Sequence, residues 1–563
     1  MVDQGRRAAD RPAFRARVAL GLGRRAALGL GRRALLVVLA SLSLAGPAYG
    51  ASAGVTSVQA TDIAMRLPVV RAQLHAHRRA YPDVSSMPGE WQVGFYSGTT
   101  EIVQVLVAKA DGRVLGAYTG YKIAWTMARG YSGAFGGLLD ALYIWLPLCA
   151  AFLVPFFQWR RPLSLVNLDL LALCSLSVSL AFFNNADVAA SVPLAYPPLL
   201  YLLARATWIA LARRPAPTAL SLNVPVRWLA VGVVLLAAGR IALNIADSTV
   251  IDVGYANVVG AQKVATGKAI YADFPTAIAR GDTYGPVSYE AYVPFVELFG
   301  FARSWSSLPA AHAAAIFFDL LALALLFLLG RRVRGPGLGV ALAYAWAAYP
   351  FTAFVLECNT NDAVLADCVL AALLLAGSAP RRGALAALAS LTKLAPLAAA
   401  PVLLTHRLRE TRWRGLIGFC GAFALVAVVA GEPAWAHDAL ATIYRRTAGY
   451  QAGRSTPFSV WGLYGGMGSW QSAAQVVVIV LVVALALAPR REDAVGLAAA
   501  LAASLIAVQL VSGYWFYPYI VWFFGPLVLV LLGSHEDLLD RVGSKRLRAA
   551  DQHAHQPRVF LAR

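Results

Sequence analysis

The sequence predicts an all-α polytopic membrane protein with a small α+β domain near its N-terminus. Of the 563 residues, 59% are hydrophobic and only 14% are charged, and the mean hydropathy is +0.61. These values lie outside the norm for soluble globular domains. Apolar runs long enough to cross about 30 Å of hydrocarbon recur along the chain. The short segments between them carry paired arginines, as in multi-pass proteins.

The net charge of +20 is too dispersed to indicate a nucleic-acid partner. The basic residues form short clusters between apolar runs, which is the positive-inside pattern and not a DNA-binding stripe. The five cysteines lie in or beside apolar segments and show no CxxC spacing. The sequence therefore predicts neither a disulfide framework nor a zinc site.

Residues 1–53 are predicted to be a signal peptide or a signal anchor. Nine arginines precede Ala34, and an apolar run then leads to the small-residue segment AYGASA. Residues 54–135 would follow as an extracytoplasmic α+β domain. A helix is expected over 62–79, before the alternating runs WQVGFY and EIVQVLVA, a turn, and the strand RVLGAYTG. This order weakly resembles PepSY-type extracytoplasmic domains.

About eleven transmembrane helices are expected, or twelve with a retained anchor. Residues 136–246 would supply four crossings, and residues 308–532 the others. The run 384–404 is an exception, because basic clusters on both of its flanks favour the cytoplasm. We expect this run to be a broken helix that enters the membrane and returns near Lys393. A lysine facing lipid would cost about 3 kcal/mol, so Lys393 is expected to face a pocket.

Two large extracytoplasmic loops are expected, residues 247–307 and 432–470, and they should meet above the membrane. The second carries three arginines on the side opposite the cytoplasm, which are Arg445, Arg446 and Arg454. A guanidinium fork matches phosphate oxygens, so these arginines would bind lipid headgroups or a lipid-linked phosphate substrate. Residues 533–563 are expected to form a basic cytoplasmic tail of this plasma-membrane protein.

The first loop contains two candidate general bases, Asp252 and Asp247. An acid at the membrane interface can take the proton of a hydroxyl nucleophile when its surroundings tune its pKa. The alternative is that Asp252, Ser248 or Thr249 caps an amphipathic surface helix.

Aromatic and polar residues near this loop suit sugar recognition, because ring faces stack on C–H surfaces while acids and amides bind hydroxyl groups. An interfacial aromatic belt or a helix cap is the alternative reading. The candidates are Tyr255, Asp282, Tyr284, Tyr289, Glu290, Asn361 and Asp362. Asp319 and His312, within a predicted span, are read as a functional interior or as a structural polar pair.

Three patterns together carry a family resemblance. These are Y-x-x-x-x-G-A-x-x-x-x-x-G-x-x-I-Y from Tyr255, Y-G-P-x-x-Y from Tyr284, and T-K-L-A-P around Lys393. Over residues 225–532 the chain resembles the GT-C glycosyltransferases, particularly those of the actinobacterial family 87 type. The added N-terminal domain and four early spans depart from simpler members.

The resemblance implies an inverting transfer of a sugar, mannose- or arabinose-like, from a polyprenyl-phosphate donor to an extracytoplasmic acceptor. It maps the catalytic aspartate to Asp252, with Asp247 as a rival, and places Lys393 near the donor phosphate. No cofactor is expected, and a divalent metal held by clustered carboxylates is the open alternative. The expected partners are the lipid-linked donor, a lipid or glycan acceptor and membrane lipids.

Two other classes of function remain open at this point. The broken helix, Asp319 and Lys393 would also suit a secondary transporter, although transporters usually show internal repeats and short outward loops, and this chain shows neither. An envelope sensor or scaffold would use the spans only as an anchor, and would not need polar residues at so many depths.

Overall fold

The computed structural model describes residues 54–130, 135–211, 222–275, 278–301, 308–488 and 492–533. The chain divides into two compact units between Ala124 and Trp125, and each unit is described by itself. The predicted signal segment, residues 1–53, and the tail from residue 534 onward lie outside the described residues.

The first unit is a four-stranded antiparallel sheet, in the order β1-β2-β3-β4, with short helices. Its elements are α2 Ser57–Met65, α3 Pro68–Ala76, β1 Tyr81–Met87, β2 Glu90–Ser97, β3 Thr100–Ala108, β4 Val114–Thr119 and α4 Tyr121–Ala124. Val93, Phe95, Val103 and Val105 of the two central strands are buried in one apolar core with α2. The α+β prediction is confirmed.

Two details of this unit differ from the prediction. The single helix expected over 62–79 is two helices, because Pro68 lacks an N–H group and begins a new helix at its first turn. Strand β1 was not expected, because six of its seven residues are exposed and no apolar alternation marks it.

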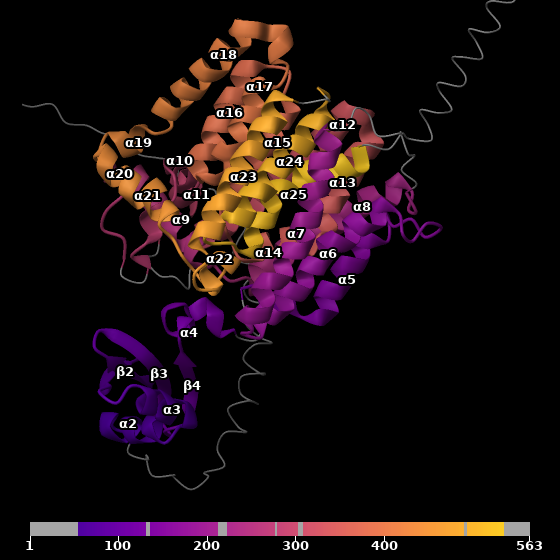
Figure 1. Ribbon diagram of the computed structural model, residues 1–563. Helices are drawn as coiled ribbons and strands as arrows, with labels where there is room; N and C mark the ends of the chain where they lie inside the picture. The colour runs from indigo at the N-terminus through magenta and orange to yellow at the C-terminus, as the bar shows by residue number, and fades with distance from the viewer. Residues whose placement is uncertain are drawn as a thin grey trace, which may run out of the picture. The chain divides into compact units, whose positions relative to one another are not determined.

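The second unit is helical (Figure 1). Its first part contains α5 Leu142–Leu153, α6 Leu165–Asn184, α7 Val188–Leu211, α8 Val226–Asp247, α9 Asp252–Ala265, α10 Pro286–Glu290, α11 Val293–Phe299 and α12 Pro309–Arg334. The middle part contains α13 Pro336–Ala348, α14 Pro350–Glu357, α15 Asp362–Leu374, α16 Ala379–Thr392, α17 Ala400–Thr405 and α18 Leu408–Val429. The last part contains α19 Glu432–Trp435, α20 Leu440–Arg446, α21 Ala448–Ala452, α22 Val460–Leu463, α23 Gly468–Leu487, α24 Ala494–Val511 and α25 Ile520–Gly533.

Within the described residues, seven helices are long and apolar enough to cross a membrane, and these are α6, α7, α8, α12, α18, α23 and α24. The bent pair α13 and α14 would make an eighth. The other three predicted crossings coincide with the shorter helices α5, α15 and α25. The protein is therefore a multi-pass membrane protein, as predicted.

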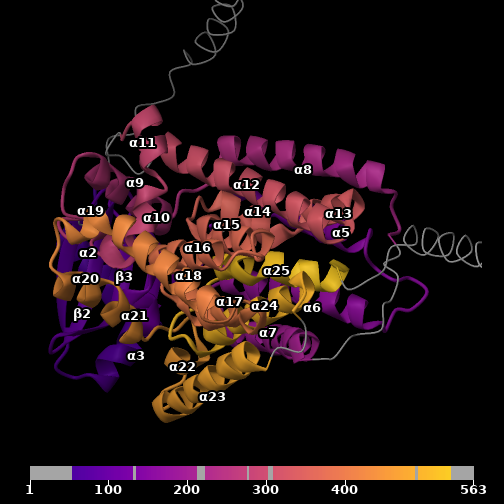
Figure 2. The same cartoon turned by 90° about the horizontal axis from the view of Figure 1, so that it is seen from above.

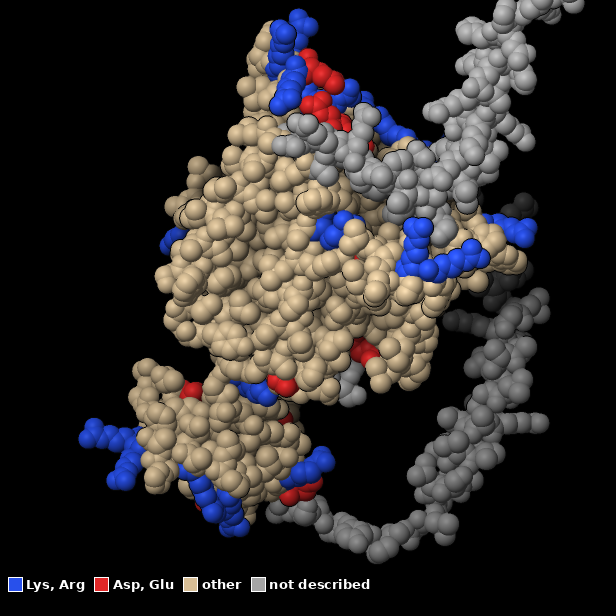
Figure 3. Space-filling model, turned by 45° about the vertical axis from the view of Figure 1, so that its right-hand side comes forward, with Lys and Arg blue, Asp and Glu red and all other residues tan. Residues whose placement is uncertain are grey.

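Burial separates the central helices from the peripheral ones. Almost every residue of α24 and α25 is buried, whereas α8, α18 and α23 are largely exposed. Figure 2 shows α8 and α23 on opposite sides of the bundle, and Figure 3 shows a broad face with few charged residues. The exposed apolar helices are the ones suited to contact lipid.

The helix break occurs at Lys393. Helix α16 ends at Thr392, Lys393 is extended, with φ −144° and ψ 150°, and a 3₁₀ turn begins at Ala395. Pro396 stands in that turn, where it cannot donate to a continued helical hydrogen-bond ladder. The structure thus has the break at the residue where the sequence predicts it.

The two large loops contact each other. The Asp438 carboxylate of the second loop accepts hydrogen bonds from the backbone N–H groups of Ile270 (2.9 Å) and Tyr271 (3.2 Å) of the first. Ile270 and Tyr271 also share an apolar cluster with Ala434 and Ile443. Helices α9 to α11 accordingly lie beside α19 to α21 in Figure 1.

Candidate active site

Asp252 is the first residue of α9, and backbone contacts fix its place. The N–H groups of Thr249 and Ile251 donate to the carbonyl oxygens of Glu357 (3.1 Å) and Cys358 (3.2 Å). A Cβ at Gly254 would collide with the carbonyl oxygen of Asn359, so only glycine permits this approach. The start of α9 is therefore held against the turn that precedes α15.

Lys393 lies in a buried ion pair surrounded by aromatic rings. Its Nζ is 2.5 Å from Oδ1 of Asp362, and the side chains are 9% and 1% exposed. Nε1 of Trp522 donates to the same oxygen at 2.7 Å. Nζ also lies 5.7, 5.1 and 5.3 Å from the ring centroids of Tyr284, Tyr519 and Trp522. These rings stabilise the ammonium group as well as enclosing it.

A glycine places Tyr284 beside Lys393. The N–H of Gly285 donates to the carbonyl oxygen of Thr392 at 3.2 Å, and a Cβ at Gly285 would collide with the carbonyl oxygen of Leu391. The Y-G-P turn therefore packs directly on the end of α16, immediately before the helix break.

Arg454 is the second cation of this region. Its Cζ lies 3.6 Å from the ring centroid of Tyr514, 5.6 Å from that of Tyr450 and 5.9 Å from that of Trp125. A Cβ at Gly513 would collide with the carbonyl oxygen of Arg454. The Nε atom is buried and has no hydrogen-bond partner among the described residues. Arg454 thus keeps a donor available in an aromatic setting.

Asp252, Lys393 and Arg454 form one electrostatic cluster. Burial raises the pKa of the Asp252 carboxyl, while the N–H of Val253 and the charges of Arg454 and Lys393 lower it. The Asp252 side chain is nevertheless exposed to solvent. A carboxylate that is both accessible and closely surrounded is expected in a recess rather than on a convex surface.

The other two arginines belong to α20 and contact other groups. Nη1 of Arg446 is 3.3 Å from Oδ2 of Asp282, which is 3% exposed, while the Arg446 side chain is 48% exposed. Arg445 is exposed and donates within its own helix, to the Ala441 carbonyl and the Thr442 hydroxyl. Of the three predicted arginines, the structure brings only Arg454 to Lys393.

Three further candidates have structural contacts. Oδ2 of Asp247 accepts the N–H of Leu138 at 2.5 Å. The hydroxyl of Tyr289 donates to the carbonyl oxygen of Gly281 at 2.7 Å and fixes the turn before Tyr284. Tyr255 lies in the apolar core between α9, α11 and α12. These positions favour roles in folding for all three side chains.

Asn361 and Glu290 contact different parts of the chain. The amide of Asn361 donates to Ser288, whose hydroxyl donates to Asn257 of α9 at 2.7 Å. Burial and the charge of Glu432 raise the pKa of Glu290 to about 7. Asn361 thus joins α15 to α9, whereas Glu290 faces the second loop.

Residues 283–513 match the sequence model of Glycosyltransferase family 87. Over these residues the chain is similar to family 87. The matched region contains Tyr284, Asp362, Lys393 and Arg454, and Asp252 precedes it. The predicted resemblance to family 87 is confirmed over the matched residues.

Among solved structures, the chain matches the crystal structure of ArnT from Cupriavidus metallidurans bound to undecaprenyl phosphate. The sequences are 18% identical and the TM-score is 0.38. The match covers 58% of this chain and 63% of ArnT, which is less than two thirds of that protein. No curated protein matches the chain.

The cluster around Lys393 and Arg454 includes aromatic residues that the sequence interpretation missed. Tyr514, Tyr519 and Trp522 belong to GYWFYPYIVW, which reads as the start of an apolar span. The many aromatic residues in this segment were the feature of the sequence that could have indicated a role in the site. Asp319 also has a partner outside the prediction, because its Oδ1 lies 2.6 Å from Nη2 of Arg240 and not beside His312.

The candidate metal ligands do not converge. Within the described ranges, no group of three or more His, Cys, Asp or Glu side chains is arranged to hold a metal ion. Asp362 is engaged by Lys393 and Trp522. The positive side chains whose charges act on Asp252 are Arg454 and Lys393.

Proposed function

We propose that the protein is an integral membrane glycosyltransferase that moves a sugar from a polyprenyl-phosphate donor to an extracytoplasmic cell-envelope acceptor. The observation that carries the proposal is that the charges of Lys393 and Arg454 act on the carboxyl group of Asp252, whose side chain is exposed. The match of residues 283–513 to family 87 supports the reaction class. ArnT, crystallised with undecaprenyl phosphate, supports a lipid-linked donor.

Asp252 is the general base in this mechanism. Its carboxylate takes the proton of the acceptor hydroxyl as that oxygen attacks the anomeric carbon of the donor sugar. The bond between the anomeric carbon and the phosphate oxygen breaks, and its electron pair leaves with the polyprenyl phosphate. Attack opposite to the leaving group inverts the anomeric configuration. The raised pKa of Asp252 makes its carboxylate a stronger base than an ordinary aspartate.

Lys393 and Arg454 stabilise the departing phosphate. The charge on the phosphate grows as the glycosidic bond breaks, so fixed cations at this place stabilise the transition state more than the bound donor. Nε of Arg454 has no hydrogen-bond partner in the part of the chain that the structure describes, whereas Lys393 is already paired with Asp362. Arg454 is therefore the main phosphate ligand among the predicted residues. Lys393 stabilises the phosphate by its positive charge without donating to it directly.

The tyrosines of the cluster bind the sugar. The ring of Tyr284 lies beside Lys393, and that of Tyr514 lies against Arg454. A mannose- or arabinose-like sugar could stack its C–H face on either ring. Asp282, whose Oδ1 is buried without a partner among the described residues, is a candidate for binding sugar or acceptor hydroxyls. The mechanism requires no cofactor, because Lys393 and Arg454 neutralise a lipid monophosphate.

Transfer from labelled polyprenyl-phosphate mannose and polyprenyl-phosphate arabinose, in membranes carrying the protein, tests the proposal. Asp252→Asn should lower the transfer rate by about 10²- to 10⁴-fold, the usual contribution of a general base. Glu297→Gln is the matched control, since Glu297 is an exposed acid of the same loop. Equal transfer by wild type and Asp252→Asn would reject the assigned base. Absence of transfer from every donor, with solute counterflow in proteoliposomes, would favour a transporter.

A further inference from the structure

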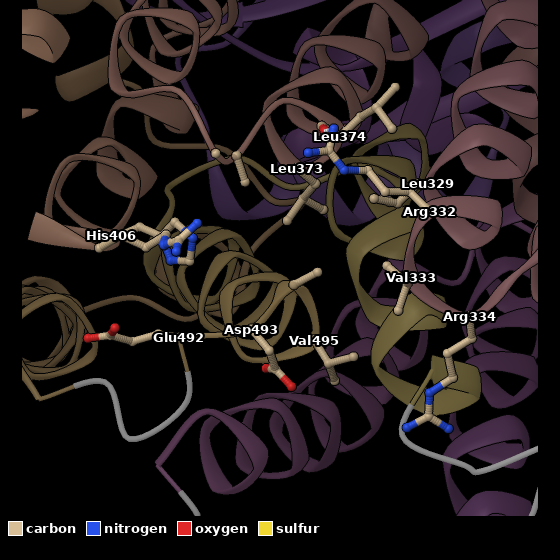
Figure 4. A pocket seen from close by; sticks show the side chains of 14 residues that line it. Leu329, Arg332, Val333, Arg334, Leu373, Leu374, His406, Glu492, Asp493 and Val495 are labelled. Atoms are coloured by element: carbon tan, nitrogen blue, oxygen red, sulfur yellow. Dashed lines mark hydrogen bonds between the residues drawn. The ribbon is translucent and has the colours of Figure 1, made fainter. Parts of the chain in front are cut away.

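A cavity lies at one end of α15 and α24, and the other ends of these two helices reach the candidate active site. It has a volume of about 480 Å³ and is lined by the C-terminal ends of α12 and α15, the residues after α17, and the start of α24 (Figure 4). Helix α15 begins at Asp362 and ends at this cavity, while α24 begins here and ends at Val511. Since the 18 residues of α24 span about 27 Å, the two sites are separated by about the thickness of the hydrocarbon core of a bilayer.

Two arginines of α12 supply the charge in this cavity. Nη1 of Arg332 donates to the carbonyl oxygen of Leu374 at 2.8 Å, which holds its guanidinium over the end of α15. Nη1 of Arg334 is buried and has no hydrogen-bond partner among the described residues. A buried guanidinium N–H group without a hydrogen-bond partner raises the free energy of the folded protein, unless a bound ligand accepts a hydrogen bond from it.

The other charged residues that line the cavity do not neutralise the positive charges of Arg332 and Arg334. Arg407 is already paired with Glu410 at 2.8 Å. Oδ1 of Asp493 accepts the N–H of Gly496 at 2.8 Å and caps α24. Glu492 and Asp493 are exposed to solvent at the rim. Burial and the charges of Arg382 and Arg407 lower the pKa of His406 to about 4, so the imidazole is neutral.

Apolar side chains share the cavity with the arginines. Leu329, Val333, Leu373 and Val495 line it, and they belong to helices whose other turns form the membrane bundle. Figure 4 shows Arg332, Arg334, Leu329 and Val333 on the α12 side, with Val495 facing them. A ligand that fits these walls has an anionic head and an apolar body, and lies at the membrane surface.

We propose that this cavity binds the phosphodiester of a phospholipid headgroup through Arg332 and Arg334. The volume is that of a small-molecule site, and basic pockets between helices at the cytoplasmic face bind lipid headgroups. The many arginines at this end of the bundle favour the cytoplasmic side. The site is separate from the donor site, so the proposal stands independently of the transferase reaction.

The test uses full-length protein purified in detergent, delipidated, and titrated with phosphatidylglycerol and phosphatidylethanolamine micelles, with bound lipid counted by native mass spectrometry. The double variant Arg332→Gln and Arg334→Gln should bind both lipids about 25-fold more weakly, since each arginine near a headgroup contributes about fivefold. Arg331→Gln is the matched control, because Arg331 is an exposed arginine of the same helix end outside the cavity. Its affinity should equal that of the wild type.

A second variant leaves every arginine in place. A Cβ at Gly377 would meet only the Arg332 guanidinium, at 4.0 Å, so Gly377→Glu would supply an internal anion and should also displace the lipid. Lipid binding by the double variant at wild-type strength, or equal losses in Arg331→Gln, would overturn the proposal. Displacement of the lipids by millimolar inorganic phosphate would keep the phosphate chemistry but overturn the assignment to a phospholipid.

Discussion

At the scale of single residues, the Lys393–Asp362 pair is the clearest structural determinant of the candidate site. Both side chains are almost fully buried, and their separation is 2.5 Å. Lys393→Met should destabilise the protein by about 3–5 kcal/mol, because it leaves the Asp362 carboxylate buried without its cation. Thermal unfolding in detergent measures the effect.

The double variant Lys393→Met and Asp362→Asn separates folding from activity. It removes both charges and should recover most of the lost stability. Sugar transfer should stay low, because the cation behind the leaving phosphate is gone. A double variant that is no more stable than Lys393→Met would contradict the assigned charge pair.

Glu290 gives a pH dependence of stability with a defined sign. Its pKa of about 7 in the folded protein lies above the ordinary value of about 4.3, so the folded state binds the proton more tightly than the unfolded state. The stabilisation is complete below the ordinary value and is lost as the pH rises through 7. The unfolding temperature of the wild type should therefore fall between pH 5 and 8.

Glu290→Gln keeps the shape of the side chain without its titration, and its unfolding temperature should change less over this range. Glu297→Gln, at an exposed acid of the next helix, should behave as the wild type. Identical pH profiles for Glu290→Gln and the wild type would show that another group controls the dependence.

At the scale of elements, close backbone contacts of glycines position the cluster. Gly285→Ala should push the Y-G-P turn away from Leu391 and separate Tyr284 from Lys393. We expect at least a tenfold loss of transfer rate, since misplacement of a site residue by about 1 Å can cost 10²-fold. Gly465→Ala, where an added Cβ meets nothing within 4 Å, is the control. Full activity of Gly285→Ala would show that this contact does not position the site.

The sequence indicated most elements of the membrane unit because isolated polar residues stand out in an apolar chain. Lys393 and Pro396 marked the helix break, and Arg454 stood out by opposing the charge bias. The burial and length of each helix were harder to predict. Hydropathy alone does not distinguish a buried helix such as α15 from a lipid-facing one such as α18. The bend of 58° between α13 and α14 follows from Pro350, which stops the first helix.

The aromatic part of the cluster could not be read from spacing. Tyr519 and Trp522 look like ordinary members of an apolar span, and only the folded chain brings them to Lys393. Conversely, Tyr255 and Tyr289 resemble sugar-binding residues by type, yet tertiary packing uses both in the interior. Residue type helped to identify the charged residues of the site, but it did not distinguish aromatic residues of the site from those of the protein interior.

At the scale of the whole molecule, the N-terminal unit has its own apolar core. We therefore expect residues 54–124, expressed alone, to unfold in one cooperative thermal transition followed by circular dichroism. Phe95→Ala should lower its stability by about 3–5 kcal/mol, because Phe95 is 1% exposed. Non-cooperative melting of the isolated unit would show that its stability depends on the remainder of the chain.

The contact between the two large loops was predictable at this scale, because the topology predicted from the sequence puts both loops on the same side of the membrane. The contacts that join them, such as Asp438 with Ile270 and Tyr271, were not predictable. They connect residues more than 160 positions apart, and no local pattern encodes such pairing. The spacing of residues in the sequence does not relate Asp252 to Lys393. The family resemblance does, because it maps both residues to one active site.

Main-chain contacts at Gly254, Gly285 and Gly513 hold the framework around the reacting groups. The rings of Tyr284, Tyr514 and Tyr519 form part of the surface of the site, but they do not make these backbone contacts. We therefore expect combined mutations of these tyrosines to change the preference for the donor sugar without unfolding the site, provided that the three glycines are kept.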